Sequence, residues 1–277
     1  MISGLRRTWG GLALDRPRIM GVLNVTPDSF SDGGDHLTPD AAIAAGLAMG
    51  AAGADIIDVG GESTRPGSQA TPPDVEQRRI LPVIRALASA GLRISVDTRH
   101  ASTMAAALDA GAAIVNDVSA LSHDPAAAAL VAARNCAVVL MHMRGDPAKM
   151  YAEANYGDVV LDVQRELAER IRAAERAGIA SGQIAIDPGV GFAKTPGQSM
   201  ELLRRLSELA SLGYPILVGV SRKSFMAGIV RQAEPRQRLA GSLAAGLFAL
   251  SHGATILRVH DVVETVQAIT VWRTLLL

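Results

Sequence analysis

Residues that can ionise or form hydrogen bonds recur at the carboxyl ends of eight short apolar segments. In chain order they are Asn24, Asp58, Asp97, Asn116, His142, Asp187, Lys223 and the pair Arg258 and His260. Such side chains at the end of a buried strand are costly without partners, which favours ligand contact over simple solvation. No Ser-His-Asp or Cys-His pairing occurs among them, so covalent catalysis has little support.

The apolar segments indicate which elements position these side chains. They are Ile19–Leu23, Ile56–Val59, Ile94–Val96, Ile114–Val115, Val138–Met141, Ile184–Ile186, Ile216–Val220 and Ile256–Val259. Near-continuous apolar runs of this kind are typical of strands buried on both faces. Segments rich in Ala, Leu, Arg and Glu with helical periodicity lie between them. The order is therefore strand and helix, repeated eight times.

This repeat predicts an α/β fold in which residues 1–277 form one domain, a (β/α)8 TIM barrel. An open doubly wound sheet is the alternative, and the repeat count favours the barrel, as does the lack of a G-x-G-x-x-G motif after the first strand. In such a barrel the carboxyl ends of the strands carry the active site. The start of the chain is expected to be a strand that leads into the fold.

Three signals place helices within this scheme. Thr38 followed by Pro39 predicts a helix start with proline at the first helical position. Ile80, Ile84 and Leu87 have the spacing of one buried helix face. Asp261 and Glu264 have the spacing of a capping box, which predicts another helix start there.

Composition bounds the function and the compartment. The chain has 27 Lys and Arg against 27 Asp and Glu, a balance that argues against a nucleic-acid or membrane-surface binder. The single cysteine, Cys136, cannot form an intramolecular disulfide, which favours a reducing compartment such as the cytoplasm. The longest weakly polar stretch, Leu239–Leu250, is shorter than the roughly 20 residues that span a bilayer.

Four longer strings carry a family resemblance. They are Gly21–Gly34, Asp58–Gly67, Ser221–Ser224 and Arg258–Asp261, and on them the chain resembles the dihydropteroate synthase family of folate biosynthesis. The resemblance implies a TIM barrel that joins (7,8-dihydropterin-6-yl)methyl diphosphate to 4-aminobenzoate. The products would be 7,8-dihydropteroate and pyrophosphate. It also implies a homodimer and sensitivity of the 4-aminobenzoate site to sulfonamides.

The resemblance implies a pterin pocket with a carboxylate, an amide and a cation. Asp187 would accept from the 2-amino group and N3, Asn116 would pair with the pyrimidine edge, Asp97 would lie near the pyrazine ring, and Lys223 would reach the carbonyl and N5. Met141 and Gly219 would line the same pocket. The structural alternative is that Asp97 and Asp187 cap the helices that follow them, since Asp is a favoured N-cap residue.

A second implied subsite holds the diphosphate. Arg258 and His260 are two residues apart, so on one strand their side chains share a face. The resemblance assigns both to the diphosphate and assigns Asn24 to an accompanying Mg²⁺. A Mg²⁺ held mostly by substrate oxygens and water needs few protein ligands.

For 4-aminobenzoate the resemblance points to the loops that carry Phe30, Asp32, Thr64, Arg65 and Pro66. Phe192 and Ser224 would form the wall of this subsite. The loops would order around the amine once the diphosphate is bound. The chain departs from the family pattern at Ala193, where Gly is usual, at Gln198 and Ser199, where His-Asn is usual, and at His100.

Two other functions fit the same sequence. A pterin-dependent methyltransferase can share the barrel and the Asp/Asn pterin set, and a corrinoid requirement would distinguish it. A non-catalytic pterin-binding paralogue is the other, and a turnover assay would distinguish that one.

Overall fold

The computed structural model describes residues 8–26, 38–62, 71–145, 153–230 and 234–276, with the side chains of residues 228 and 230 not described. An 8-stranded parallel sheet forms its centre, in the order β8-β7-β6-β5-β4-β3-β10-β9. Its strands are β3 (Arg18–Asn24), β4 (Ile56–Gly60), β5 (Ile94–Asp97), β6 (Ile114–Asp117), β7 (Ala137–Met141), β8 (Ile184–Asp187), β9 (Leu217–Gly219) and β10 (Ile256–Val259). Ile186 also bridges to Ile216, just before β9. This bridge closes the sheet into a barrel.

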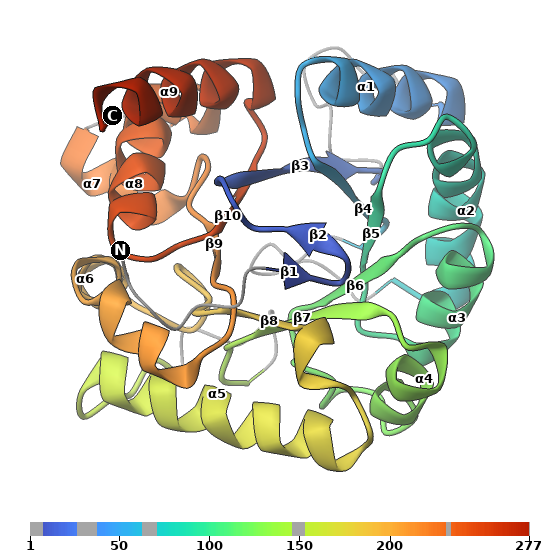
Figure 1. Ribbon diagram of the computed structural model, residues 1–277, viewed down its shortest axis with the longest axis horizontal. Helices are drawn as coiled ribbons and strands as arrows, with labels where there is room; N and C mark the ends of the chain where they lie inside the picture. The colour runs from blue at the N-terminus through green and yellow to red at the C-terminus, as the bar shows by residue number, and fades with distance from the viewer. Residues whose placement is uncertain (1–7, 27–37, 63–70, 146–152, 231–233, 277) are drawn as a thin grey trace.

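Helices surround the barrel (Figure 1). They are α1 (Pro39–Ala51), α2 (Pro73–Ser89), α3 (Ala101–Asp109), α4 (Ala127–Arg134), α5 (Val159–Arg176), α6 (Pro196–Arg204), α7 (Ala227–Val230), α8 (Leu239–Ser251) and α9 (Val262–Leu275). Short 3-10 turns complete them: η2 (Ser181–Gln183), η3 (Leu206–Leu212), η4 (Ser224–Met226) and η5 (Pro235–Arg238). The predicted (β/α)8 barrel is confirmed, and all eight predicted strands are present. Among the described residues, no helix is long and apolar enough to cross a membrane.

The helix signals have different outcomes. The Thr38 hydroxyl accepts a hydrogen bond from the Ala41 N–H, as an N-cap before Pro39 should. Ile80, Ile84 and Leu87 are fully buried against the sheet. The capping-box prediction at Asp261 is wrong. Helix α9 does begin at Val262, but no side chain caps it, because the Asp261 carboxylate pairs with the Arg222 guanidinium instead.

The chain start differs from the expected single strand. Two short antiparallel strands, β1 (Thr8–Trp9) and β2 (Leu12–Ala13), form a hairpin in front of the barrel in Figure 1. Trp9 is 1% exposed and packs with residues at the strand beginnings, such as Met20 and Ile56. Its indole N–H donates to the Gln183 carbonyl over 2.8 Å. The hairpin therefore closes the amino-terminal opening of the barrel.

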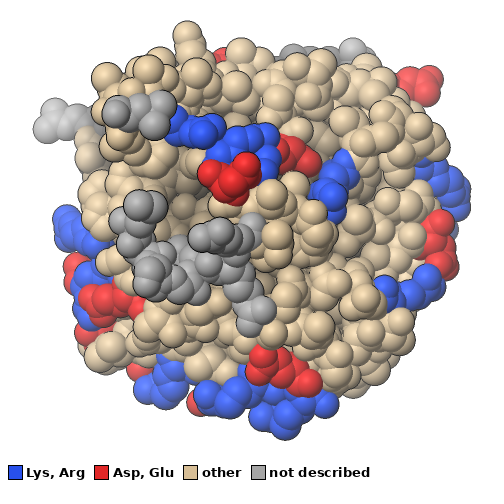
Figure 2. All heavy atoms as spheres, viewed as in Figure 1, with Lys and Arg blue, Asp and Glu red and all other residues tan. Residues whose placement is uncertain are grey.

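This closed end also carries buried charge. Figure 2 shows the face seen in Figure 1, where acidic and basic side chains adjoin near its upper centre. The Arg18 guanidinium donates to Asp55 over 3.0 Å and to Asp15 over 2.6 Å. Arg18 is buried and begins β3, so this cluster belongs to the amino-terminal end, away from the strand ends expected to bind ligand.

Candidate active site

Strand register brings the carboxyl-terminal polar residues into rows. Asn24 on β3 is aligned with Gly60 on β4, Gly60 with Asp97 on β5, and Asp97 with Asn116 on β6. Met141 on β7 is aligned with Asp187 on β8. Because parallel strands end at the same edge, these side chains meet at one mouth of the barrel.

Arg258 crosses this mouth from β10. Its Nε donates to Asp58 Oδ2 over 2.6 Å, and its Nη2 donates to Asp97 Oδ2 over 2.7 Å. The Asn116 amide donates to the same Asp58 oxygen over 3.0 Å. Burial raises the pKa of Asp97 to about 7, while the Arg258 charge opposes that rise. Asp58, Asp97, Asn116 and Arg258 therefore form one connected polar group.

Asp187 and Lys223 face the mouth from β8 and from the segment after β9. Asp187 Oδ1 accepts from the Gly189 N–H over 2.7 Å. The Lys223 ammonium donates to the Val190 carbonyl and lies 4.5 Å from the centroid of the Phe192 ring. Burial raises the pKa of Asp187 and lowers that of Lys223 to about 8, and each charge opposes the shift of the other.

Gly219 lies next to two of these charged side chains. It is aligned with Arg258, and a Cβ at Gly219 would lie 3.9 Å from Lys223 Nζ and 3.8 Å from Arg258 Cβ. Both distances are those of ordinary van der Waals contact, so Gly219 lies beside both cations.

The capping alternative for the two aspartates does not hold. Helix α3 has His100 at its N-cap, and helix α6 has Thr195, which forms a capping box with Gln198. Asp97 and Asp187 are the last residues of β5 and β8 and cap neither helix. Their carboxylates at the mouth are therefore not explained by helix capping.

The other predicted site residues have these positions. His260 follows β10, with Nδ1 3.1 Å from the Ser221 hydroxyl oxygen. Asn24 ends β3 and is partly exposed, Met141 is buried at the end of β7, and Ser224 is exposed at the start of η4. Phe30, Asp32, Thr64, Arg65 and Pro66 lie outside the described residues.

Described residues on either side of positions 63–70, which include the predicted site residues Thr64, Arg65 and Pro66, are linked to each other. Glu62 Oε1 accepts from the Thr71 N–H over 3.1 Å, so one side chain joins the residues on either side of positions 63–70. The Arg99 guanidinium donates to the same oxygen over 3.1 Å. Glu62 therefore joins Thr71 and Arg99 through one carboxylate oxygen.

The departures from the family pattern are accommodated locally. Ala193 has φ of +48°, a left-handed conformation that glycine adopts without steric cost, which accounts for the usual Gly. Gln198 completes the capping box, and the Ser199 hydroxyl accepts from the Gly191 N–H over 3.2 Å. His100 Nδ1 lies 3.2 Å from Glu76 Oε2.

Two buried residues were not among the predicted site residues, although Asp58 was one of the polar side chains noted at the strand ends. Asp58 is fully buried and accepts hydrogen bonds from both Arg258 and Asn116. Lys194 is 1% exposed, with its ammonium against the His142 ring and loop carbonyls. A signal for Lys194 was present: the chain has only three lysines, at 149, 194 and 223, so a lysine after a strand is unusual here.

The polar side chains at the barrel mouth fit a metal ion that is held mainly by the substrate and only in small part by the protein. Among the residues that the structure describes, no three His, Cys, Asp or Glu side chains gather into a metal site. Asn24 presents an amide, whose oxygen can supply one Mg²⁺ ligand at the strand end. That fits a Mg²⁺ held mainly by diphosphate oxygens and water.

Known proteins share this sequence and architecture. Residues 20–260 match the family described as "Pterin binding enzyme". The dihydropteroate synthase of Mycobacterium leprae is 48% identical over 268 residues, covering 94% of this chain and 94% of that protein. A structure of Xanthomonas albilineans dihydropteroate synthase with 4-aminobenzoic acid has a TM-score of 0.90 at 50% identity, covering 96% of this chain and 95% of the other. The same enzyme in complex with 7,8-dihydropteroate gives 0.87 at 47% identity, with the same coverage.

Proposed function

The chain belongs to the pterin binding enzyme family, and from this membership we propose that it catalyses the dihydropteroate synthase reaction. It joins (7,8-dihydropterin-6-yl)methyl diphosphate to 4-aminobenzoate and releases 7,8-dihydropteroate and pyrophosphate. The similarity to the X. albilineans enzyme that binds 4-aminobenzoic acid and 7,8-dihydropteroate supports this activity. The chain is a folate-pathway transferase.

The observation that carries the proposal is the group of polar side chains at the barrel mouth, of which Asn116 and Asp187 are buried. A dihydropterin presents N–H donors beside a carbonyl and ring nitrogens, so it needs a carboxylate, an amide and a cation at fixed positions. Asp187, Asn116 and Lys223 supply those three groups. We assign Asp187 to the 2-amino and N3 protons, Asn116 to the pyrimidine edge and Lys223 to the carbonyl and N5.

Asp97 and Arg258 act where charge changes during the reaction. Substitution at the pterin methylene breaks its C–O bond to the diphosphate and forms a C–N bond to the amine, which loses a proton. Asp97, near the pyrazine ring, stabilises positive charge that develops on the pterin. Arg258 uses two of its five N–H groups on Asp58 and Asp97, and its other donors with His260 receive the departing diphosphate.

Asn24 is the proposed protein ligand of a Mg²⁺ bound with the diphosphate. The ion would neutralise charge on the leaving group. For 4-aminobenzoate we assign Phe192 and Ser224 among the described residues, with Thr64, Arg65, Pro66, Phe30 and Asp32 from outside them. Met141 and Gly219 complete the pterin pocket.

The assembly and compartment are also proposed. Apolar side chains of α8 and α9 are exposed, including Phe248, Val263, Val271 and Leu275. Such a surface is suited to a second copy of the chain, so we assign a homodimer, testable by light scattering. The lone buried Cys136 is suited to the reducing cytoplasm.

A product assay tests the function against the methyltransferase alternative. The chain is incubated with the pterin diphosphate, 4-aminobenzoate and Mg²⁺, and in parallel with a methylated pterin and a corrinoid. Dihydropteroate in the first mixture and no methyl transfer in the second are expected. Methyl transfer to the corrinoid without dihydropteroate would refute the proposal.

A further inference from the structure

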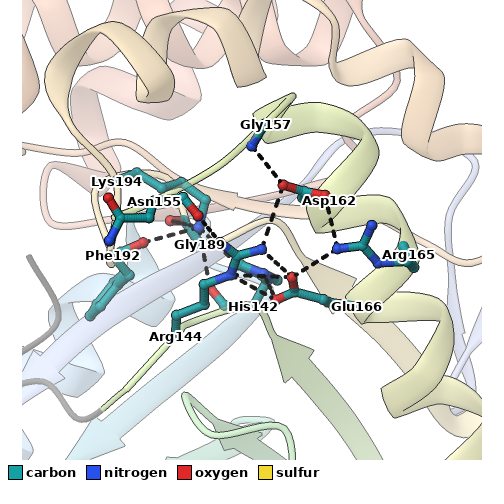
Figure 3. A network of polar contacts seen from close by, with 10 residues as sticks. All are labelled: His142, Arg144, Asn155, Gly157, Asp162, Arg165, Glu166, Gly189, Phe192 and Lys194. Atoms are coloured by element: carbon teal, nitrogen blue, oxygen red, sulfur yellow. Dashed lines mark hydrogen bonds and ion pairs between the residues drawn. The ribbon is translucent and has the colours of Figure 1, made fainter. Parts of the chain in front are cut away.

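The Lys194 ammonium is fully satisfied by hydrogen-bond acceptors. Its Nζ lies 2.9 Å from His142 Nδ1, 3.0 Å from the Phe192 carbonyl and 3.1 Å from the Gly189 carbonyl. A fourth acceptor, the His142 carbonyl oxygen, lies 3.5 Å away. An ammonium has three donors, and the three shorter contacts use all of them. Figure 3 shows the Lys194 side chain reaching from the segment before α6 toward His142. Lys194 thus holds the loop that follows β8 through hydrogen bonds to two of its carbonyl groups.

The contacts of His142 define which ring nitrogen carries the proton. Nδ1 faces the Lys194 donor, so it acts as the acceptor, and Nε2 donates to Glu166 Oε2 over 2.9 Å. Glu166, on α5, also accepts from the Arg144 guanidinium (Figure 3). Burial lowers the pKa of His142 to about 4, which is consistent with a neutral ring. The loop is therefore tied through Lys194 and His142 to α5.

The loop of residues 188–194 has several residues in the left-handed conformation. Gly189, Gly191 and Ala193 have φ of +65°, +81° and +48°, so every second residue is left-handed. A Cβ at Gly189 would lie 1.9 Å from the His142 carbonyl oxygen, which shows how closely the loop packs on the end of β7. Ala193 carries a Cβ in this conformation, which is sterically unfavourable for residues other than glycine.

The same loop contacts the residues assigned to the pterin. The Gly189 N–H donates to Asp187, the Val190 carbonyl accepts from Lys223, and the Phe192 ring lies under the Lys223 ammonium. Two of the four Lys194 acceptors, on Gly189 and Phe192, belong to residues that make these contacts. A shift of the loop would move the partners of Asp187 and Lys223 together.

We propose that Lys194, oriented by His142, is a positioning residue for the pterin subsite: it fixes the loop of residues 188–194 and thereby the directions of Asp187 and Lys223. Lys194 acts on the loop carbonyls and not on the substrate. The inference rests on the proposed function for its kinetic consequence, while the hold on the loop is a property of the protein alone.

Two pairs of variants test the inference in the full chain. Lys194→Met keeps the apolar stem and removes the three donors. His142→Gln places its amide near the Nε2 position and removes the acceptor for Lys194, whereas His142→Asn keeps an oxygen near the Nδ1 position. Arg18→Met is the matched control, because it removes a buried cation at the opposite end of the barrel.

The first readout is steady-state pyrophosphate release. For Lys194→Met and His142→Gln we expect kcat/KM for the pterin diphosphate to fall by about a hundredfold, the scale of a misplacement near 1 Å, with much less change in KM for 4-aminobenzoate. His142→Asn should stay closer to the wild type. Arg18→Met should lower thermal stability and leave kcat/KM unchanged.

The second readout is amide hydrogen exchange of peptides spanning residues 187–194, measured without substrate. Faster exchange in Lys194→Met and His142→Gln, but not in Arg18→Met, is expected. Folded variants with wild-type kcat/KM and unchanged exchange would overturn the inference, and if Lys194→Met does not fold, equal behaviour of His142→Gln and His142→Asn would overturn it too. A wild-type chain that releases no pyrophosphate would instead contradict the proposed function, with the exchange result still deciding whether Lys194 holds the loop.

Discussion

Arg258 Nε lies 2.6 Å from Asp58 Oδ2, a contact that joins β10 to β4 across the barrel mouth and spans 200 residues of sequence. Asp58 is fully buried, and its Oδ2 also accepts from Asn116. One carboxylate therefore orients both the cation assigned to the leaving group and the amide assigned to the pterin.

Replacement of Asp58 by asparagine tests this shared role. Asp58→Asn keeps the shape and removes the charge that holds Arg258. Hydrogen bonds to charged groups contribute about 1.5–3 kcal/mol, so kcat/KM for the pterin diphosphate should fall by about ten- to a hundredfold. Asp74→Asn, in an exposed ion pair with Arg78 on α2, is the matched control and should change nothing. If the Asp58→Asn and Asp74→Asn variants had equal kcat/KM, Asp58 would have no role in the reaction.

The pterin assignment predicts a binding defect in two variants. Lys223→Met and Asp187→Asn each leave a polar group of the pterin without its partner. The cost is about 1–3 kcal/mol per lost buried hydrogen bond, or roughly ten- to a hundredfold in affinity. Calorimetry with the pterin diphosphate alone measures it, and thermal melting checks the fold. Wild-type affinity in both folded variants would contradict the assignment.

The pKa shifts predict a narrow pH optimum. Asp97 must be ionised to hold Arg258, and it gains its proton as the pH falls through about 7. Lys223 must be protonated to donate, and it loses its proton as the pH rises through about 8. We expect kcat/KM for the pterin diphosphate to be greatest between these values and to fall on both sides. A profile that stays flat through neutrality would contradict this reading, and Asp97→Asn should lose the acidic limb.

The 4-aminobenzoate subsite should form only after the diphosphate is bound. Equilibrium binding of 4-aminobenzoate should be weak in the bare protein, tight with pyrophosphate and Mg²⁺, and weak again after chelation of the metal. A sulfonamide should compete with 4-aminobenzoate and not with the pterin diphosphate. Arg65→Ala should raise KM for 4-aminobenzoate and leave pterin affinity nearly unchanged. Tight binding of 4-aminobenzoate without pyrophosphate would refute the ordered sequence.

The amino-terminal hairpin should serve stability and not catalysis. Trp9→Ala removes a large side chain that is 1% exposed and packs in the barrel interior. The free energy of unfolding should fall by about 3–5 kcal/mol, as measured by urea denaturation. Because Trp9 lies at the end opposite the site, kcat/KM should be unchanged where the variant is folded. A large kinetic defect at full stability would show that the two ends are coupled.

The strands and the mouth residues were predictable because each signal is local. An apolar run followed by Asp or Asn needs no knowledge of the rest of the chain, and Asp97, Asn116 and Asp187 all lie where such a run ends. The hairpin that carries Trp9 was not predictable in this way. Its strands have two residues each, and their burial depends on the barrel that they close.

The hydrogen-bond and ion-pair partners of the site residues could not be predicted from the sequence either. Asp261 has the spacing of a helix cap, but its carboxylate pairs with Arg222, 39 residues away in sequence, and that competition is set by the tertiary structure. The roles of Asp58 and Lys194 depend on contacts across the barrel and across the β8–α6 loop in the same way. Residue types and strand ends identify candidates, whereas the fold selects their partners.

The stoichiometry of the reaction tests the proposed dihydropteroate synthase activity most directly. The full chain is given the pterin diphosphate and Mg²⁺, with and without 4-aminobenzoate, and pyrophosphate and 7,8-dihydropteroate are measured together. We expect one pyrophosphate for each dihydropteroate, with release dependent on 4-aminobenzoate and strongly reduced in Lys223→Met. Absence of dihydropteroate, or pyrophosphate release at the same rate without the amine, would contradict it.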